Sequence, residues 1–438
     1  MLKTTDPKIY NLIKDEEKRL KETLQMIASE NYPSKAVLEA LGSAFNFKYS
    51  EGYPHARYYQ GQEFADEVEI TAQERAKKLF KVPYVNVQPY SGSPANAAVQ
   101  LAILTPLKSK IMGLSLAFGG HLTHGSPVSF SGKLFKSVSY ELDDKGFLDY
   151  EEIEKQAIKE KPDLIICGAT AYPRLIDFKK FGEIADKVGC YLMADISHIT
   201  GLIIAGVHPN PVPYVHIVTT TTHKTLRGPR GAMIMVTEKG FKKDKDLPTK
   251  INKAVFPGLQ GGPHDNQTAA IAVALLEASK PSFKKYGEQI VKNSKTLAAE
   301  LKKCNFNLIS GGTDNHLLLV DLTNKGLNGA AVAFALEVAG IVLNKNAVPN
   351  DQNPPFYPSG IRFGTAALTT RGLKAKDMVK VAKWMNEVVQ RLPKMELPKS
   401  KEERAVVWEK FQKETLKNKN LLQIGKEVKA FALKFPTP

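Results

Sequence analysis

Short apolar segments of strand length alternate with amphipathic helical segments through the middle of the chain. Residues 163–168 and 191–195 are predicted strands, and the helical periodicity of residues 179–188 lies between them. Strands that alternate with helices in this way are typical of a parallel sheet with helices on both faces. The sequence therefore predicts an α/β fold whose main part is such a sheet.

The pattern changes after about residue 280. Two long helical segments, 266–279 and 283–303, lead to strands and helices that lack the regular alternation. A chain of 438 residues is long enough for two domains rather than one. We expect residues 1–280 to form an N-terminal arm and a large domain. Residues 281–438 are expected to form a small α+β domain with a basic helical tail.

The chain carries a formal net charge of +16, from 61 Lys and Arg against 45 Asp and Glu. Its lysines are spread over amphipathic helices, and no basic motif interleaved with aromatic residues occurs. This favours a solvated basic surface, or attraction of an acidic substrate, over nucleic-acid binding. Three cysteines without metal-type spacing favour a reducing compartment and no metal site. Without an apolar signal core or a run of membrane-spanning length, we expect a cytoplasmic protein that does not enter a membrane.

One lysine stands between two apolar strands. The β-branched residues 217–222 lead to His223 and Lys224, the turn 228–231 follows, and residues 232–236 form a second predicted strand. Most lysines are exposed and solvated, but no charged face surrounds this one. A desolvated lysine near other cations is held partly neutral and can act as a nucleophile. Lysines of this kind form Schiff bases, most often with pyridoxal phosphate.

Other polar groups supply what that cofactor needs. Ser91–Ser93 follow a predicted strand (84–88) and open a helix (95–104), where unpaired N–H groups favour a phosphate. Asp195 ends a strand, where parallel sheets bind ligands, and can pair with a pyridinium nitrogen. Arg362 lies in an apolar strand-like segment and suits a substrate carboxylate. The serine turn and Asp195 are each more often structural when they occur alone, but together with the lysine and Arg362 they favour a cofactor site.

Two loops extend this set. Gly119 and Gly120 precede His121, so the backbone can approach a planar ligand and the imidazole can stack on it. A lone histidine is more often structural. Residues 49–59 are dense in tyrosine, which fits either a binding site or simple packing at an interface. His198 lies three residues after Asp195, close enough to join the same site.

Eleven motifs then match one family, in order along the chain. The chain resembles the serine hydroxymethyltransferase (glycine hydroxymethyltransferase) family of pyridoxal phosphate enzymes, from about residue 6 to about residue 392. The motifs are IASEN (27–31), YSEGYP (49–54), RYY (57–59), NVQPYSGSPAN (86–96), GGHLTHGSPV (119–128), AYPR (171–174), YLMADISHITGLI (191–203), TTTTHKTLRGPRG (219–231), FPGLQGGP (256–263), NKNAVPND (344–351) and SGIRFGT (359–365). The resemblance implies the aspartate aminotransferase-like fold of fold type I. Such a fold has a mainly parallel seven-stranded sheet in the large domain and a smaller α+β C-terminal domain.

The resemblance also implies how the cofactor is bound. Lys224 would form the Schiff base, Asp195 would pair with the pyridine nitrogen, and His121 would stack on the ring. The phosphate would be held by Ser91, Gly92 and Ser93, with Gly262 from the neighbouring subunit. The remaining cofactor residues implied are Tyr49, Thr170, His198, Thr221 and His223.

Substrate roles follow in the same way. Arg362 would bind the amino-acid carboxylate with help from Tyr58, and Glu51 would be the acid–base residue. Tyr49, Glu51 and Tyr59 would reach across a homodimer interface, and Tyr59 and His198 would join the catalytic set. The substrate and folate positions implied are Ser29, Leu116, Gly120, Leu122 and Asn346.

The implied reaction moves the one-carbon unit of L-serine to tetrahydrofolate through an external aldimine, giving glycine and 5,10-methylenetetrahydrofolate. Two alternatives remain. A threonine aldolase or aminotransferase on the same fold would share Lys224, Asp195 and Arg362 without needing Glu51. A basic nucleic-acid-binding protein would show a steep salt dependence of binding. The chain departs from the usual family residues at Tyr90, Pro94, Thr170 and Ala366.

Overall fold

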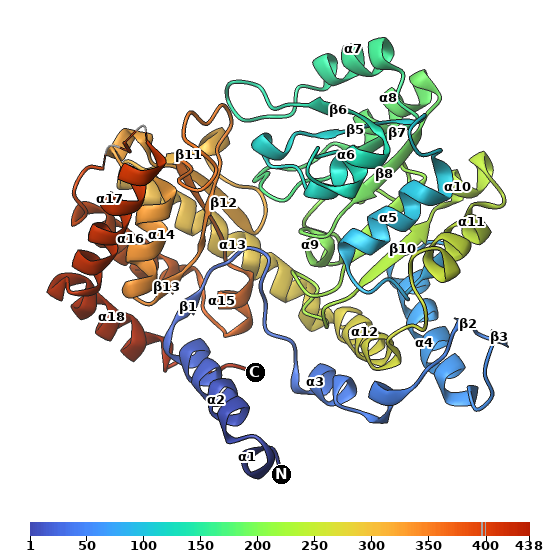
Figure 1. Ribbon diagram of the computed structural model, residues 1–438, viewed down its shortest axis with the longest axis horizontal. Coiled ribbons are helices and arrows are strands. Elements are labelled where there is room, and N and C mark those ends of the chain that lie inside the picture. Colours follow the sequence, from blue (N-terminus) through green and yellow to red (C-terminus); the bar gives the residue numbers. More distant parts are fainter. Residues whose placement is uncertain (396, 399) are drawn as a thin grey trace. The chain divides into compact units, whose positions relative to one another are not determined.

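The computed structural model describes residues 1–395, 397–398 and 400–438, which form two compact units (Figure 1). The large unit comprises residues 33–288. The small unit comprises residues 1–32 together with residues 289–438.

The N-terminal arm belongs to the small unit, whereas the sequence grouped it with the large domain. Strand β1 (Leu24–Gln25) pairs in parallel with β13 (Ile341–Val342). Helix α2 (Pro7–Glu22) packs against α18 (Lys419–Ala432) near the other end of the chain. These partners lie several hundred residues apart, so a local pattern could not reveal the pairing. The second division falls within α13 (Pro281–Lys303), close to the boundary that we expected near residue 280.

Seven strands form the sheet of the large unit, in the spatial order β4-β10-β9-β8-β7-β5-β6. Only β10 runs antiparallel to its neighbours, because a turn after β9 reverses the chain. β7 and β10 are continuously apolar, whereas β9 ends in three threonines, and every residue of these three strands is buried, as in the central strands of such a sheet. The predicted mainly parallel seven-stranded sheet is confirmed. Its strands are β4 (Tyr84–Asn86), β5 (Lys110–Leu114), β6 (Lys136–Tyr140), β7 (Leu164–Cys167), β8 (Tyr191–Asp195), β9 (Ile217–Thr221) and β10 (Ala232–Val236).

Four α-helices of the large unit, α3, α7, α8 and α10, begin at a residue whose side chain accepts a hydrogen bond from the first turn. Asp149 accepts hydrogen bonds from the first turn of α7, and Asp177 does the same for α8. A short hairpin, β2 (Gly52–Tyr53) and β3 (Ala56–Arg57), precedes α4. The helices are α3 (Lys35–Leu41), η1 (Ala44–Phe47), α4 (Glu63–Phe80), α5 (Gly92–Ile103), η2 (Leu116–Phe118), η3 (Leu122–His124), α6 (Phe130–Leu134), α7 (Tyr150–Glu160), α8 (Phe178–Val188), α9 (Thr200–Ile204), α10 (Glu238–Lys243), α11 (Leu247–Lys253), η4 (Ala254–Leu259) and α12 (Asp265–Ala278).

The small unit contains a four-stranded antiparallel sheet, in the order β11-β12-β15-β14. Apolar side chains of this sheet, among them Leu318, Val320 and Phe363, share one core with α14, α16 and α18. The strands are β11 (Asn307–Leu308), β12 (Leu317–Asp321), β14 (Asn344–Asn346) and β15 (Gly360–Gly364). The other elements are α1 (Leu2–Thr5), η5 (Ile309–Gly311), η6 (Thr323–Lys325), α14 (Gly329–Val338), α15 (Ala366–Thr370), α16 (Ala375–Gln390) and α17 (Lys401–Leu416).

Some predicted elements have different boundaries in the structure. Residues 341–346 belong to two sheets, because β13 pairs with β1 whereas β14 pairs with β15. Strand β11 ends at Leu308 and continues as a 3-10 turn. Helix α5 begins at Gly92 rather than at residue 95, so Ser93 and Pro94 belong to its first turn.

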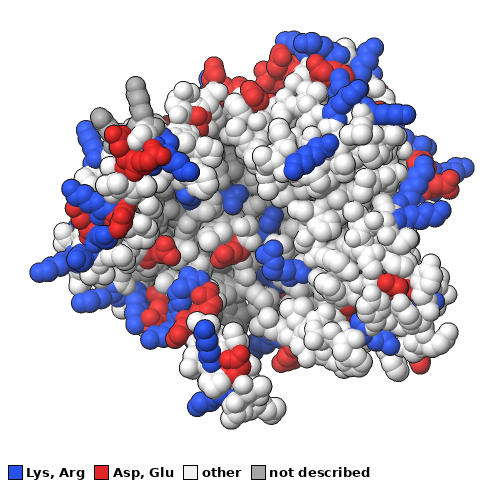
Figure 2. All heavy atoms as spheres, in the orientation of Figure 1, with Lys and Arg blue, Asp and Glu red and all other residues white. Residues whose placement is uncertain are grey.

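Charged side chains of both signs are interspersed on the face shown in Figure 2. Several ion pairs of the described residues lie within one helix, as between Lys14 and Glu17 or between Arg19 and Glu16. Within the described part of the chain, no helix combines the length and apolar character needed to cross a membrane.

Candidate active site

Lys224 follows the carboxyl end of β9, beside the end of β8, at the edge where open α/β sheets bind ligands. It lines a pocket formed by strand ends and the loops after them. The lining residues are Gly92, His121, His124, Ala169, Thr170, Asp195, Ser197, His198, Thr221 and Lys224. Most of the cofactor residues named from the sequence therefore meet in one pocket.

Asp195 is held by donors from three directions. Its Oδ2 atom lies 3.1 Å from Nε2 of His124 and accepts a hydrogen bond of 2.8 Å from the Asn96 side chain. Its Oδ1 atom accepts from the backbone (3.1 Å) and hydroxyl (2.6 Å) of Ser197. Burial alone would raise the pKa of Asp195, but His124, His121 and Ser197 together hold it well below its usual range. The group is a carboxylate at neutral pH and can pair with a cation in the pocket.

His121 forms the pocket wall at the start of η3. Its Nδ1 atom accepts a hydrogen bond from the Thr123 backbone at 3.2 Å and lies 2.8 Å from the Thr123 hydroxyl. Burial lowers the pKa of His121 to about 4, and the neighbouring His124 and Lys224 act in the same direction. The imidazole is therefore neutral at physiological pH, which suits stacking on a planar group.

Ligand atoms of His121, His124 and Asp195 lie within 4.8 Å of one another. Two imidazoles and a carboxylate can bind a divalent transition metal by type, although the sequence predicted no metal site. Asn96 and Ser197 already donate to the same carboxylate. The negative charge and the hydrogen bonds of Asp195 therefore suit an organic cation as well as they suit a metal ion.

Two buried atoms beside Lys224 have no hydrogen-bond partner among the described residues, namely Thr221 Oγ1 and His223 Nδ1. Because buried polar atoms are normally hydrogen-bonded, this pair is available to a ligand. A Cβ atom at Gly92 would stand 2.7 Å from Thr221 Cγ2, so only glycine leaves that space open. Ser91 is the N-cap of α5 and makes no side-chain capping bond, which leaves the hydroxyl and the first-turn N–H groups for an anion. These features fit a phosphate-bearing cofactor.

A second group of predicted residues gathers around Glu51. The Tyr59 hydroxyl donates to Glu51 Oε2 at 2.8 Å, and the Tyr49 hydroxyl donates to Oε1 at 3.4 Å. The hydrogen bond to Glu51 raises the pKa of Tyr59. Tyr49 packs over Gly262, where a Cβ atom would stand 3.2 Å from the ring. None of these residues lines the Lys224 pocket.

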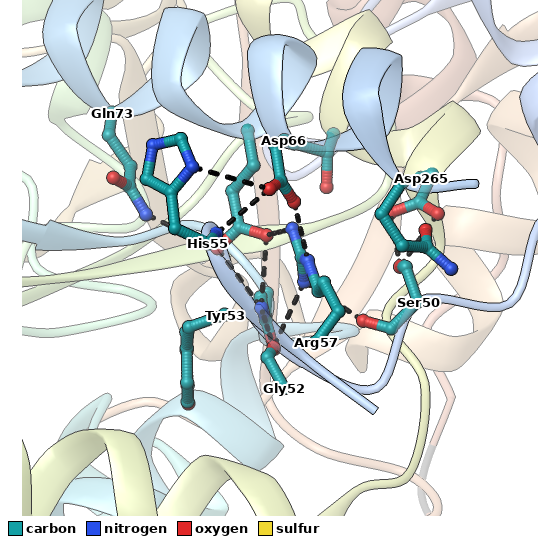
Figure 3. Close-up of polar contacts among 12 residues, drawn as sticks. Ser50, Gly52, Tyr53, His55, Arg57, Asp66, Gln73 and Asp265 are labelled. Atoms are coloured by element: carbon teal, nitrogen blue, oxygen red, sulfur yellow. Dashed lines mark hydrogen bonds and ion pairs between the residues drawn. The ribbon is translucent and has the colours of Figure 1, made fainter. Parts of the chain in front are cut away.

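Figure 3 shows how the hairpin after Glu51 is held. The Arg57 guanidinium donates to Asp66 Oδ1 at 2.8 Å and to Glu69 Oε2 at 2.7 Å, both on α4. It also donates to the carbonyls of Ser50 and Gly52 at 2.9 Å each. Burial would lower the pKa of Arg57, but Glu69 and Asp66 raise it above its usual value. The strand pairing and the buried cation thus fix the hairpin to α4.

Gln88 joins this network to the loop before Ser91. Its side-chain nitrogen donates to Gly52 O and to both oxygens of Glu69, each at 3.0 Å. The backbone carbonyl of Gln88 accepts a hydrogen bond of 3.0 Å from the Gln260 side chain. Burial raises the pKa of Glu69 although Arg57 opposes the shift.

Three predicted substrate residues lie in the small unit. Arg362 is in the middle of β15, and its Nε donates to Asn344 Oδ1 at 3.2 Å. Burial lowers the pKa of Arg362 to about 10. Asn346 ends β14 on the same sheet. Ser29 follows the segment that runs beside Gly364, whose N–H donates to Met26 O at 2.7 Å.

The remaining positions lie on loops of the large unit. Leu116 and Leu122 are about half exposed on the turns η2 and η3. Gly120 lies between these turns, where a Cβ atom would clash with Leu114 O at 1.9 Å. The Thr170 hydroxyl donates to Gly120 O at 2.9 Å. The Tyr58 ring is 71% exposed and packs edge-on against Phe256.

Sequence reasoning missed several residues that shape the site. His124 and Asn96 bind Asp195, and Gln88 joins the hairpin to the phosphate loop. The spacing His121-x-x-His124 was a usable signal, because both residues follow the same glycine pair. Tyr90 stacks on His264 with ring centroids 4.1 Å apart and donates to Gly262 O at 2.7 Å.

Comparison with known proteins identifies the family of the chain. The family model described as serine hydroxymethyltransferase matches residues 2–385. The chain belongs to this family. A serine hydroxymethyltransferase of Desulfotalea psychrophila is 53% identical over 437 residues, covering 100% of this chain and 96% of the relative. The chain is also similar to the serine hydroxymethyltransferase of Acidothermus cellulolyticus, with 56% identity over 388 residues that cover 88% of this chain and 89% of the relative. That of Legionella pneumophila strain Lens is 52% identical over 389 residues, which cover 89% of this chain and 92% of the relative.

Proposed function

We propose that this protein is a serine hydroxymethyltransferase. It transfers the one-carbon unit of L-serine reversibly to tetrahydrofolate and forms glycine and 5,10-methylenetetrahydrofolate, with pyridoxal 5′-phosphate as cofactor. The observation that carries the proposal is the pocket that joins Lys224 to the ionised Asp195, whose carboxylate is hydrogen-bonded by His124, Asn96 and Ser197. The family membership given above supplies the substrates.

Each residue of the pocket is assigned to one part of the cofactor. Lys224 would hold it covalently, Asp195 would pair with the pyridine nitrogen, and neutral His121 would stack on the ring. When bound, the cofactor supplies an electron sink for cleavage next to the amino-acid α-carbon. Ser91, Gly92 and Ser93 would hold the phosphate. Further contacts would come from Thr170, His198, Thr221 and His223, and from Tyr49 and Gly262 across the subunit interface.

The chain positions the substrate with charged and aromatic groups. Arg362 binds the serine carboxylate in a bidentate manner, and further substrate contacts are assigned to Tyr58 and Ser29. Glu51 moves the proton between the serine hydroxyl and the folate, and Tyr59 orients its carboxylate by the hydrogen bond of 2.8 Å. Further folate contacts are assigned to Leu116, Gly120, Leu122 and Asn346.

A homodimer with shared sites explains why the Glu51 group stands apart from the Lys224 pocket. The aromatic residues Phe47, Tyr58 and Phe64 flank Glu51 and the hairpin after it in the sequence and are 69–83% exposed. Apolar surface of this kind favours association with a second copy. Glu51 of one subunit then acts in the pocket of the other.

We assign the protein to the cytoplasm. Its three cysteines are free thiols, as is usual in a reducing compartment.

The test of the activity is serine turnover with and without tetrahydrofolate. We expect glycine formation to depend on folate and to stop in Lys224→Ala. Equal turnover of serine without folate would identify an aldolase instead. Retained turnover in Lys224→Ala would place the chemistry elsewhere.

A further inference from the structure

Helix α17 lies beyond residues 2–385, the part of the chain that the family model matches. It packs on α14 and on the loop between β14 and β15 (residues 347–359, the β14–β15 loop) through aromatic side chains. Trp408 of α17 meets Tyr357 of this loop edge to face, with ring centroids 5.7 Å apart. Trp408 also contacts Phe334 of α14 at 5.9 Å and stacks on the buried Phe411 at 5.6 Å. A helix that the family model does not match thus holds a loop that lies within the matched residues.

The first part of the β14–β15 loop and its end are held by a carboxylate. Asp351 accepts hydrogen bonds from the backbones of Val348 (3.2 Å), Asn353 (2.9 Å) and Ser359 (2.9 Å). The Ser359 hydroxyl also donates to Asp351 at 2.6 Å. These bonds close the base of the loop and leave its tip to other contacts.

The tip of the loop is held from two sides. Lys345 of β14 donates to Phe356 O at 2.6 Å, and its ammonium group stands 6.0 Å from the Tyr357 ring centroid. Trp408 covers Tyr357 from α17. Phe356 is 78% exposed, and its ring centroid stands 5.7 Å from the same ammonium group.

This loop joins the edge strand β14 to β15, which has a neighbouring strand on each side. Arg362, in β15, is paired with Leu319 of β12 on one side and Asn344 of β14 on the other. Asn346 is the last residue of β14, which is an edge strand. Loosening the loop therefore moves Asn346 more readily than Arg362.

We propose that Trp408 is a positioning residue for folate, because its contact with Tyr357 holds the β14–β15 loop and through it Asn346. This inference rests on the proposed function, in which Asn346 contacts the folate and Arg362 the serine carboxylate. Loss of the aromatic contact then weakens folate use and spares serine binding.

The test compares Trp408→Ala with Val406→Ala in the cofactor-loaded enzyme. Val406 is on the same helix and 68% exposed, so it serves as the matched control. We expect Trp408→Ala to raise the KM for tetrahydrofolate about three- to tenfold, the scale of one aromatic pair. The KM for serine and the cofactor absorbance stay within about twofold, and Trp408→Phe restores the folate KM.

A second pair of variants separates positioning from general instability. Tyr357→Ala should reproduce the effect, and the double variant with Trp408→Ala should be no worse than either single one. Hydrogen exchange of residues 347–359 should quicken in Trp408→Ala but not in Val406→Ala. An unchanged folate KM, an equal rise in both KM values, additive effects or unchanged exchange would overturn the inference. A wild-type protein without folate-dependent turnover would instead overturn the proposed function.

Discussion

Gly92 lies against Thr221 so closely that a Cβ atom would stand 2.7 Å from Thr221 Cγ2. This places the first turn of α5 beside the unpaired Thr221 hydroxyl and leaves room for an anion. We predict that Gly92→Ala lowers the affinity for pyridoxal 5′-phosphate at least about tenfold, because the methyl group fills the cradle. Cofactor titration followed by absorbance measures the change.

Two further variants give this prediction its controls. Gly42→Ala adds a methyl group where the nearest atom is 3.7 Å away, and it should leave the affinity unchanged. Thr221→Ser removes the opposing Cγ2 atom, so it should partly rescue Gly92→Ala. Normal cofactor affinity in Gly92→Ala would contradict the assigned phosphate position.

The Arg57 network predicts a large stability effect. The side chains of Arg57 and Glu69 are 3% and 2% exposed, so Arg57→Met leaves a buried carboxylate without its cation. We expect the free energy of unfolding to fall by about 3–5 kcal/mol and folate-dependent turnover to fall with it. Denaturant unfolding measures the first effect. The exposed pair Lys77–Glu74 supplies the control, since Lys77→Met should cost at most about 0.5 kcal/mol. Equal effects of the two substitutions would refute the role of the network.

Buried histidines predict how stability depends on pH. Burial lowers the pKa of His216 to about 4 and, with Lys224 and Arg230, that of His223 to about 3. The unfolded chain takes up these protons near pH 6.5, before the folded one, so stability is complete above about pH 6.5 and falls between about pH 6.5 and 4. His216→Asn removes one titrating ring and keeps an acceptor for the Leu192 backbone. Thermal unfolding midpoints should then depend less steeply on pH, and an unaltered slope would disprove this account.

Shared active sites predict complementation between inactive subunits. Lys224→Ala lacks the cofactor lysine, and Glu51→Gln lacks the proton carrier. A mixed dimer carries both lesions in one site and leaves the other site intact. After subunit exchange, an equal mixture should regain about a quarter of the wild-type activity, whereas each variant alone stays inactive. A mixture that remains inactive after demonstrated exchange would place Glu51 and Lys224 in the same subunit's site.

The sequence predicted those site residues whose position follows from a nearby strand pattern. Lys224 follows its own strand and Asp195 ends the neighbouring one, so strand patterns were enough to place both at one edge of the sheet. The pairing of β1 with β13 joins residues far apart in the chain and could not be read from periodicity. The same holds for the contact of Gln88 with Glu69. His124 was missed because its partner Asp195 lies far along the sequence.

The central claim is that Lys224 binds pyridoxal 5′-phosphate covalently, and borohydride reduction tests it most directly. Reduction fixes the carbon–nitrogen bond, after which the modified peptide is located by mass spectrometry. We predict one pyridoxyl group per chain on the peptide that contains Lys224, and none in Lys224→Ala. A pyridoxyl group on another lysine, or no incorporation into the wild-type protein, would contradict the account.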